Sequence, residues 1–193
     1  MSGADPELQT ERLLLRAPAQ PLAAAVRDFQ CRNKAHFAPW EPATPPDFDA
    51  LEQISLRLLQ GEQAFAAGTA LRYWISRHEE PARVIGQIHL SQLARGPFQN
   101  AMLGYGLDQR SQGQGLMQEA LQAVIAQAFG PGIWLHRLQA AVRPENLRSR
   151  ALLRRLGFVQ EGLSRRYLFI NGGWRDHEVH ALLNPAWGHT LAP

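Results

Sequence analysis

Residues 101–129, AMLGYGLDQRSQGQGLMQEALQAVIAQAF, join an apolar strand pattern, a glycine-containing loop and an amphipathic helix. Residues 101–107 predict a strand. Residues 116–129 predict the clearest helix of the chain, because apolar side chains recur along one helical face. The loop between them contains Gly113 and Gly115. A strand, a loop and a helix in this order are typical of a mixed α/β domain.

The chain on both sides of this segment extends the α/β pattern. Further strands are expected at residues 11–16, 71–76, 84–93, 138–142, 163–170 and 174–183, and further helices at residues 23–33, 48–67 and 146–156. A turn is expected around residues 79–81, and Asn171-Gly172-Gly173 predicts a hairpin. Residues 39–46 hold four prolines, which exclude regular structure and predict a shaped loop.

Length and composition indicate a single domain, residues 1–193, with its core at about residues 10–187. Hydrophobic residues make up 45% of the chain and charged residues 19%, which suits a protein with a sizeable core. No stretch reads as a membrane span or a signal peptide, so we expect a cytoplasmic protein without a membrane partner. The single cysteine, Cys31, excludes an intramolecular disulfide and a cysteine-based metal site.

The positive charge of the chain is unevenly distributed, although the net charge is only +3. Nine arginines lie between Arg137 and Arg175, against two acids, Glu145 and Glu161. Such an excess suits an anionic partner, for example CoA phosphates or RNA. A solvated basic face is the alternative interpretation, because runs of charge usually remain in water.

The loop from Arg110 to Gly115 predicts a phosphate-binding site. A loop that leads into a helix leaves backbone N–H groups unpaired, and the helix dipole favours an anion at the same point. Glycine at positions 113 and 115 lets a phosphate approach these amides, and Arg110 adds positive charge at the loop entrance. An ordinary strand-to-helix turn is the structural alternative.

Spacing excludes two common nucleotide-binding motifs at this loop. A P-loop requires Gly-Lys-Ser/Thr, whereas Gly115 is followed by Leu116 and Met117. A dinucleotide fingerprint that starts at Gly113 requires a third glycine where Gln118 stands. The spacing fits a third pattern, a basic or amide residue followed by x-x-Gly-x-Gly, here Arg110-x-x-Gly113-x-Gly115.

Further motifs accompany the loop at matching distances. They are Leu103-Gly104-Tyr105, Asn146-x-x-Ser149, Leu156-Gly157-Phe158, His36-Phe37, Pro39-Trp40-Glu41-Pro42, His136-Arg137 and Gly173-Trp174-Arg175-Asp176-His177. With them the chain resembles the GCN5-related N-acetyltransferase (GNAT) superfamily, and within it the RimJ/RimL ribosomal-protein N-acetyltransferases, RimJ most closely. The resemblance covers about residues 10–187.

The resemblance implies a fold and an acetyl-CoA site. The fold is a single α/β domain with a mixed, mostly antiparallel twisted sheet, flanked by helices. The sheet is splayed between its fourth and fifth strands, here residues 101–107 and 138–142. Pantetheine would lie in the gap, paired with the backbone of Tyr105, Gly106 and Leu107. The pyrophosphate would lie against Arg110, Ser111, Gln112, Gly113, Gln114 and Gly115. Asn146 would reach the pantetheine arm, with helix capping as its alternative role.

The resemblance also implies the reaction, which is direct attack of an amine on the thioester. The implied acceptor is the N-terminal alanine of a ribosomal protein, with a transient ribosome contact. An α-amino group has a pKa of about 7.7 to 8.0, so it is already partly neutral near pH 7. Glu41 is the candidate that either accepts the proton as a base or holds the ammonium, and Ser149 is the candidate acid. Loop capping or simple exposure is the alternative for Glu41.

Two positions depart from the wider family pattern. Many members carry a tyrosine as general acid where Leu153 stands, and some RimL-type relatives carry a glutamate where Met102 stands. No metal is expected, because His177-Glu178-Val179-His180 lacks the spacing of a zinc helix motif and its histidines would face opposite sides of a strand. Three alternative functions remain open: acetylation of a small-molecule amine, ribosome or RNA-associated assembly on the same scaffold, and sensing of acetyl-CoA without chemistry.

Overall fold

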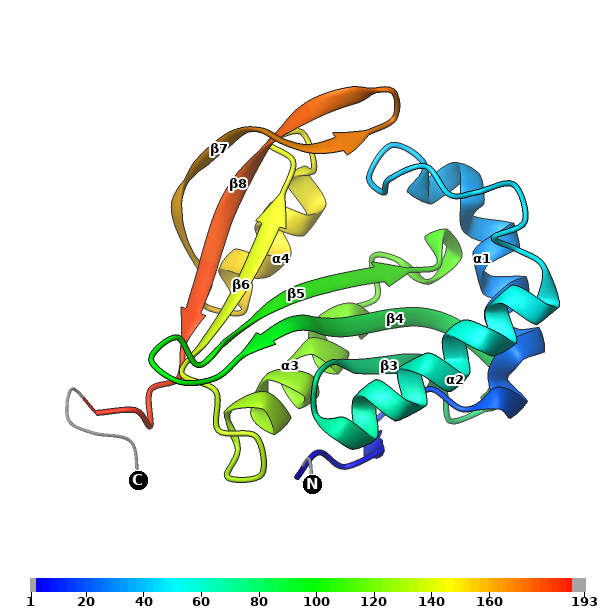
Figure 1. Ribbon diagram of the computed structural model, residues 1–193, viewed down its shortest axis with the longest axis horizontal. Helices are drawn as coiled ribbons and strands as arrows, with labels where there is room; N and C mark the ends of the chain where they lie inside the picture. Colours follow the sequence, from blue (N-terminus) through cyan, green and yellow to red (C-terminus); the bar gives the residue numbers. More distant parts are fainter. Residues whose placement is uncertain (1–2, 189–193) are drawn as a thin grey trace.

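A computed structural model describes residues 3–188, which form one mixed sheet with helices on both faces (Figure 1). The first two and the last five residues of the predicted domain lie outside the described residues. The eight strands follow the order β1-β2-β3-β4-β5-β6-β8-β7. All neighbouring strands are antiparallel except β5 and β6. The predicted α/β fold class is therefore confirmed.

The strands divide into two groups that diverge at one point. The first group comprises β1 (Glu7–Gln9), β2 (Leu13–Arg16), β3 (Leu71–Arg77), β4 (Glu80–Ala94) and β5 (Asn100–Leu107). The second group comprises β6 (Arg137–Val142), β7 (Val159–Ile170) and β8 (Gly173–Leu183). The β7–β8 hairpin turns at Asn171 and Gly172 and reaches towards the end of α1 (Figure 1).

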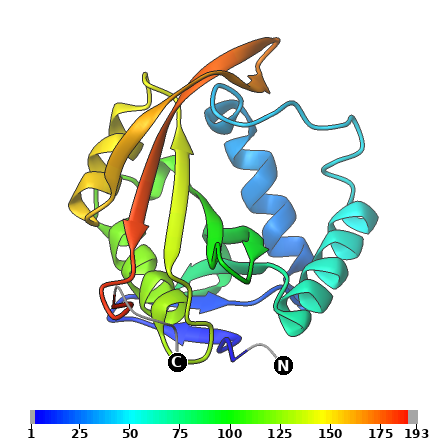
Figure 2. The ribbon, with the colours of Figure 1, turned by 60° about the vertical axis from the view of Figure 1, so that its left-hand side comes forward.

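Two pairs of helices cover the sheet. α1 (Ala23–Phe37) and α2 (Leu51–Ala67) lie on one face, and α3 (Leu116–Phe129) and α4 (Leu147–Arg155) lie on the other (Figure 2). Short 3-10 turns, η1 (Gln20–Leu22) and η2 (Gln109–Ser111), precede α1 and α3. Among the described residues, no helix is both long and apolar enough to cross a membrane.

The core lies on both faces of the sheet because the helices bury apolar stripes against it. The larger cluster includes Leu116, Leu121 and Val124 of α3, all at most 1% exposed. A smaller cluster joins α1 and α2 to the sheet through Phe29 and Trp74. These two layers fix the position of the loop before α3 and of the loop after α1.

β5 and β6 separate soon after they start. Their parallel pairing comprises only Asn100↔Arg137, Ala101↔Leu138 and Met102↔Gln139. Beyond Met102, β5 continues to pair with β4 as far as Leu107, while β6 continues to pair with β8. The edge of β5 at residues 103–107 therefore faces a gap, which is visible in Figure 1. These are the two strands predicted to splay. The short β1 makes them the fifth and sixth strands of this chain.

The structure corrects several predicted boundaries. The helix predicted to end at residue 33 continues to Phe37, and the helix predicted from residue 48 begins at Leu51. The turn predicted at residues 79–81 lies earlier, because Glu80 already pairs with Arg77. The helix predicted from residue 146 begins one residue later, since Asn146 is its N-cap. Sequence analysis missed β1, which has only three residues, none of them buried.

Candidate active site

The loop between β5 and α3 presents a row of unpaired backbone amides. Gly113 and Gly115 both have positive φ, at 78° and 77°, and α3 begins directly after Gly115. The first N–H inside this helix that reaches a carbonyl belongs to Glu119, which bonds Gly115. For the N–H groups of residues 113–118, the described part of the chain provides no hydrogen-bond partner. An anion at this helix N-terminus would satisfy them.

The beginning of this loop is fixed by α1. Asp108 is only 2% exposed, and its side chain accepts hydrogen bonds from Arg110 N at 3.0 Å and from Arg32 Nε at 2.7 Å. The buried Asn33 accepts a further bond from Gln109 N at 3.1 Å. These contacts cross 76 positions of the sequence and hold the amides in place.

The Asp108 carboxylate is stabilised in its charged form. Burial raises its pKa, but the hydrogen bonds from Arg32 and Arg110 N and the charge of Arg32 outweigh burial, so the net pKa lies below its usual value. A folded-state pKa below the unfolded one contributes stability above the unfolded pKa. That stability is lost as the pH falls through the folded pKa.

We predict that Asp108→Asn lowers the free energy of unfolding by about 3 kcal/mol at pH 7, since it leaves Arg32 without its buried partner. Below about pH 4 the difference from the unsubstituted protein shrinks, because Asp108 takes up a proton first in the unfolded chain and, at lower pH, in the folded one. Urea unfolding between pH 3 and pH 7 measures both effects. Asp28→Asn is the matched control, because Asp28 pairs with the same arginine but is 66% exposed. A loss as large for Asp28→Asn would contradict the role of Asp108.

The predicted pyrophosphate residues differ in exposure. Arg110, Gly113, Gln114 and Gly115 are exposed, whereas Ser111 is buried beneath the loop. The Gln112 side chain joins two helices, since its Nε2 lies 2.8 Å from His36 Nε2 and its Oε1 accepts from Arg148 Nη1 at 2.5 Å. Gln112 therefore ties the loop to both α1 and α4.

A side-chain contact joins β5 to α4, the helix that follows β6. Tyr105 Oη, from β5, lies 2.5 Å from Ser149 Oγ, on the first turn of α4. Burial raises the pKa of Tyr105 to about 12, so its hydroxyl keeps its proton at neutral pH. Asn146 caps α4, because its Oδ1 accepts from Ser149 N at 3.1 Å. The capping role considered for Asn146 is thus observed, and its predicted cofactor contact stays a prediction.

The proline-rich loop after α1 is held across the mouth of the gap. Arg143, between β6 and α4, donates to Pro39 O at 2.6 Å and stacks 5.4 Å from the Trp40 ring. The N–H of Glu41 bonds Phe37 O at 3.0 Å, which continues the end of α1. Glu41 is therefore carried on a loop fastened to the β6 side of the splay.

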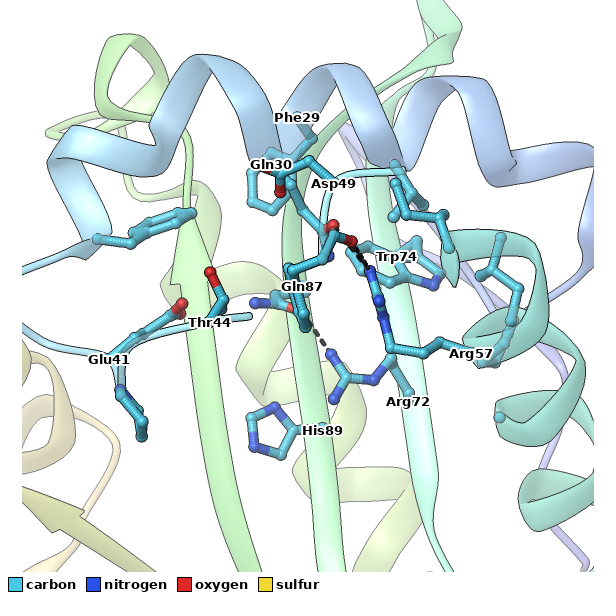
Figure 3. A pocket seen from close by; sticks show the side chains of 18 of the residues that line it. Phe29, Gln30, Glu41, Thr44, Asp49, Arg57, Arg72, Trp74, Gln87 and His89 are labelled. Atoms are coloured by element: carbon cyan, nitrogen blue, oxygen red, sulfur yellow. Dashed lines mark hydrogen bonds between the residues drawn. The ribbon is translucent and has the colours of Figure 1, made fainter. Parts of the chain in front are cut away.

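A cavity of about 990 Å³ lies between this loop and the sheet (Figure 3). Its lining includes Phe37 and Glu41, strand residues Arg72 and Gln87, and Asn171 of the β7–β8 hairpin. The sheet residues of the lining come from β3 and β4, and β5 lies next to the cavity, because a Cβ at Gly106 would be 3.4 Å from the Phe37 ring. Burial raises the pKa of Glu41, partly opposed by the positive charge of Arg72. A carboxylate in this setting accepts a proton more readily than an exposed one.

Comparison with known families decides the class of the protein. The model of the acetyltransferase (GNAT) domain family matches residues 12–159. The chain belongs to the GNAT acetyltransferase family. The resemblance inferred from the motifs is confirmed, and the splayed strands and the free amides are the features of this acetyltransferase that the motifs predicted.

Relatives of this GNAT domain place it near RimJ. The [Ribosomal protein uS5]-alanine N-acetyltransferase of Escherichia coli is 36% identical over 180 residues, which cover 93% of this chain and 92% of that protein. The solved structure of ribosomal-protein-S5-alanine acetyltransferase from Vibrio fischeri is 34% identical, with a TM-score of 0.90, and covers 95% of this chain and 100% of that one. RimJ of Mycobacterium smegmatis in complex with CoA-disulfide is 31% identical, with a TM-score of 0.82, and covers 89% and 81%.

Sequence analysis of this GNAT domain missed several residues that shape its site. Tyr105 was considered only for its backbone, although its hydroxyl contacts Ser149. Asp108 could have been found, because an aspartate before a turn is a common capping residue. Leu153, at the position of the family's tyrosine, is fully buried in the core. His177 and His180 are buried on β8, and the described residues contain no cluster suited to a metal ion.

Proposed function

We propose that this GNAT protein transfers an acetyl group from acetyl-CoA to the N-terminal α-amino group of a protein, in a ternary complex. The acceptor is the N-terminal alanine of a ribosomal protein. The single observation that carries the proposal is that the open edge of β5 has an anion site after it and a cavity beside it. The free amides of residues 113–118 follow β5 along the chain, and the cavity with Glu41 lies next to this strand, because Phe37 of its lining lies close to Gly106. The RimJ relatives, named for alanine acetylation of a ribosomal protein, support the choice of acceptor.

The cofactor end is suited to CoA by its backbone. The amides of residues 113–118 would hold the pyrophosphate, with Arg110, Ser111, Gln112, Gly113, Gln114 and Gly115 forming the loop around it. The open edge of β5 at Tyr105, Gly106 and Leu107 would bond the pantetheine amides as a missing strand does. Acetyl-CoA supplies the activated acyl group. The CoA-disulfide in the M. smegmatis relative supports this class of ligand.

The base comes from the loop after α1 and the acid from α4, and these two helices lie on opposite faces of the sheet. Glu41 takes the proton from the α-ammonium, since burial raises the pKa of its carboxyl towards that of the amine. The neutral amine then attacks the thioester carbonyl and forms the C–N bond as the C–S bond breaks. The attacking nitrogen then loses a second proton and the departing thiolate gains one. Ser149 gives its proton to the thiolate, Tyr105 Oη passes a proton to Ser149 through their contact, and the proton released by the nitrogen returns to Tyr105 through water.

The experiment that tests the biological acceptor is intact-mass spectrometry of ribosomal proteins from cells that lack this gene. The expected result is one ribosomal protein lighter by a single acetyl group, with the mass restored by the unsubstituted gene. No mass difference would overturn the ribosomal acceptor. Acetylation of small amines by the purified protein, without turnover of any peptide, would favour the small-molecule alternative instead.

A contact with the ribosome belongs to the same proposal. The β7–β8 hairpin exposes Phe169 and Trp174, and it belongs to the arginine-rich range from Arg137 to Arg175. Exposed aromatic and arginine side chains together suit an RNA surface.

A further inference from the structure

Two arginines lie in the part of the cavity away from Glu41. Arg72 comes from β3 and Arg57 from α2, and Figure 3 shows Glu41 on the opposite side of Gln87 from both of them. Arg72 is the strand partner of His89, and Gln87 lies two residues before it on β4, so these side chains share the sheet face that forms the cavity floor.

Within the part of the chain that the structure describes, neither guanidinium has a carboxylate partner. Arg72 donates to Gln87 Oε1 and stacks 5.5 Å from the Trp74 ring. Arg57 donates to Phe48 O at 2.8 Å and stacks 3.8 Å from the Phe48 ring. Across residues 3–188, no acid lies within ion-pair distance of either arginine. An arginine has five N–H donors, so both retain donors for a ligand.

The charge of these two arginines is only partly compensated. Burial lowers the pKa of Arg72, the charge of Glu41 opposes this, and the charge of Arg57 lowers the pKa further. Burial also lowers the pKa of Arg57, and the charges of Asp49 and Asp47 oppose it. Asp49, the other acid of the cavity wall, is already paired with Lys34 at 2.6 Å. Both arginines are half-buried, and like charges at partly buried positions are stabilised by a counter-charge or by further hydrogen bonds. A bound carboxylate would supply both, because the arginine fork matches its geometry.

The size of the cavity indicates where that carboxylate comes from. An alanine residue alone fills little of about 990 Å³, which is room for several residues of a peptide. With the amine at Glu41, the following residues extend across Gln87 towards the arginines. We propose that Arg72, Arg57 and Gln87 bind an acidic side chain within the first four residues of the acceptor. This specificity rests on the proposed function. It adds a requirement on the residues that follow the acetylated alanine.

The test uses the full chain, acetyl-CoA and a set of Ala-initiated peptides with one Glu at position 2, 3 or 4, each beside its isosteric Gln peptide. For at least one position we expect kcat/KM to be tenfold or more higher with Glu, as measured by release of the CoA thiol. Arg72→Gln should reduce that ratio to below threefold. Arg72→Lys keeps the positive charge but loses the paired N–H donors of the guanidinium, so its Glu/Gln ratio should be intermediate. An intermediate ratio also shows that the loss in Arg72→Gln is not a folding defect.

The matched control is Lys34→Gln, which removes a cation from the same cavity wall. Its charge is already paired by Asp49, so the Glu/Gln ratio should stay at the value of the unsubstituted protein. Equal kcat/KM for Glu and Gln peptides at all three positions overturns the carboxylate site while leaving the proposed function intact. Turnover of free amino acids in preference to every peptide also overturns the proposed side-chain site. The arginines would then bind the α-carboxylate of the amino acid itself. Failure to acetylate any peptide overturns the proposed function, and this site with it.

Discussion

Glu41→Gln is expected to lower kcat/KM for an Ala-initiated peptide by about 100-fold or more, because a positioned general base contributes 10²–10⁴. Glutamine keeps the shape and the hydrogen-bonding oxygen of Glu41 but cannot take a proton. Arg143 holds the loop through Pro39 O and the Trp40 ring, and these contacts do not involve the Glu41 side chain. The loop should therefore retain its conformation.

The pH dependence separates proton transfer from simple binding. In the unsubstituted protein, kcat/KM should fall as the pH drops through the Glu41 pKa, which burial holds above the usual carboxyl range. Protonation of the acceptor amine below about pH 8 should cost the unsubstituted enzyme little, because Glu41 removes that proton in the complex. Glu41→Gln can use only the neutral amine, so its kcat/KM should fall as the pH drops below about 8.

Glu62→Gln, an exposed position of α2, is the control and should leave kcat/KM unchanged at every pH. Rates for Glu41→Gln within threefold of the unsubstituted enzyme across the pH range would remove Glu41 from the chemistry and leave a structural role in the loop.

Gly113→Val is expected to raise KM for acetyl-CoA by about 100-fold. A branched side chain at a φ of 78° is strained and occupies the open space in front of the amides of residues 113–118. Loss of two hydrogen bonds to a charged phosphate, at about 1.5 kcal/mol each, corresponds to that factor. The KM for the peptide should change little, because the acceptor enters from the other end of the gap.

The matched control for Gly113→Val is Gly96→Val, in the connection between β4 and β5. Gly96 also has a positive φ, 66°, and open space around its Cβ position. Both substitutions should lower the melting temperature by similar amounts, because the backbone strain is similar. Only Gly113→Val should affect acetyl-CoA, and equal KM values for the two variants would contradict the pyrophosphate assignment.

Local patterns predicted the framework of the fold well. Residues 116–129 have a regular apolar face and follow Gly115, and the predicted helix matches α3 at both ends. The helix predicted before the proline-rich loop stops at Asn33, four residues before α1 ends at Phe37. Asn33 is instead buried inside α1, where its Nδ2 donates to Phe29 O.

The site was only partly predictable, because its important contacts join distant positions. Tyr105 meets Ser149 across 44 residues, and Arg32 meets Asp108 across 76. No local periodicity carries such information. The position of Arg72 in the cavity is even harder to predict from sequence, since a basic residue in a strand usually faces water. Only the tertiary structure encloses Arg72 between α2 and β4. Motif spacing succeeded where the backbone itself forms the site, as in the loop with Gly113 and Gly115.

The central claim is that the acceptor is an N-terminal α-amine and the donor is acetyl-CoA. The most direct measurement incubates the full chain and acetyl-CoA with an Ala-initiated ribosomal peptide that contains one internal lysine, beside the same peptide with a blocked N-terminus. Fragmentation mass spectrometry then locates the acetyl group. The account predicts a single acetyl group on the alanine nitrogen and no product from the blocked peptide. Acetylation of the lysine, or equal rates for the two peptides, would contradict it.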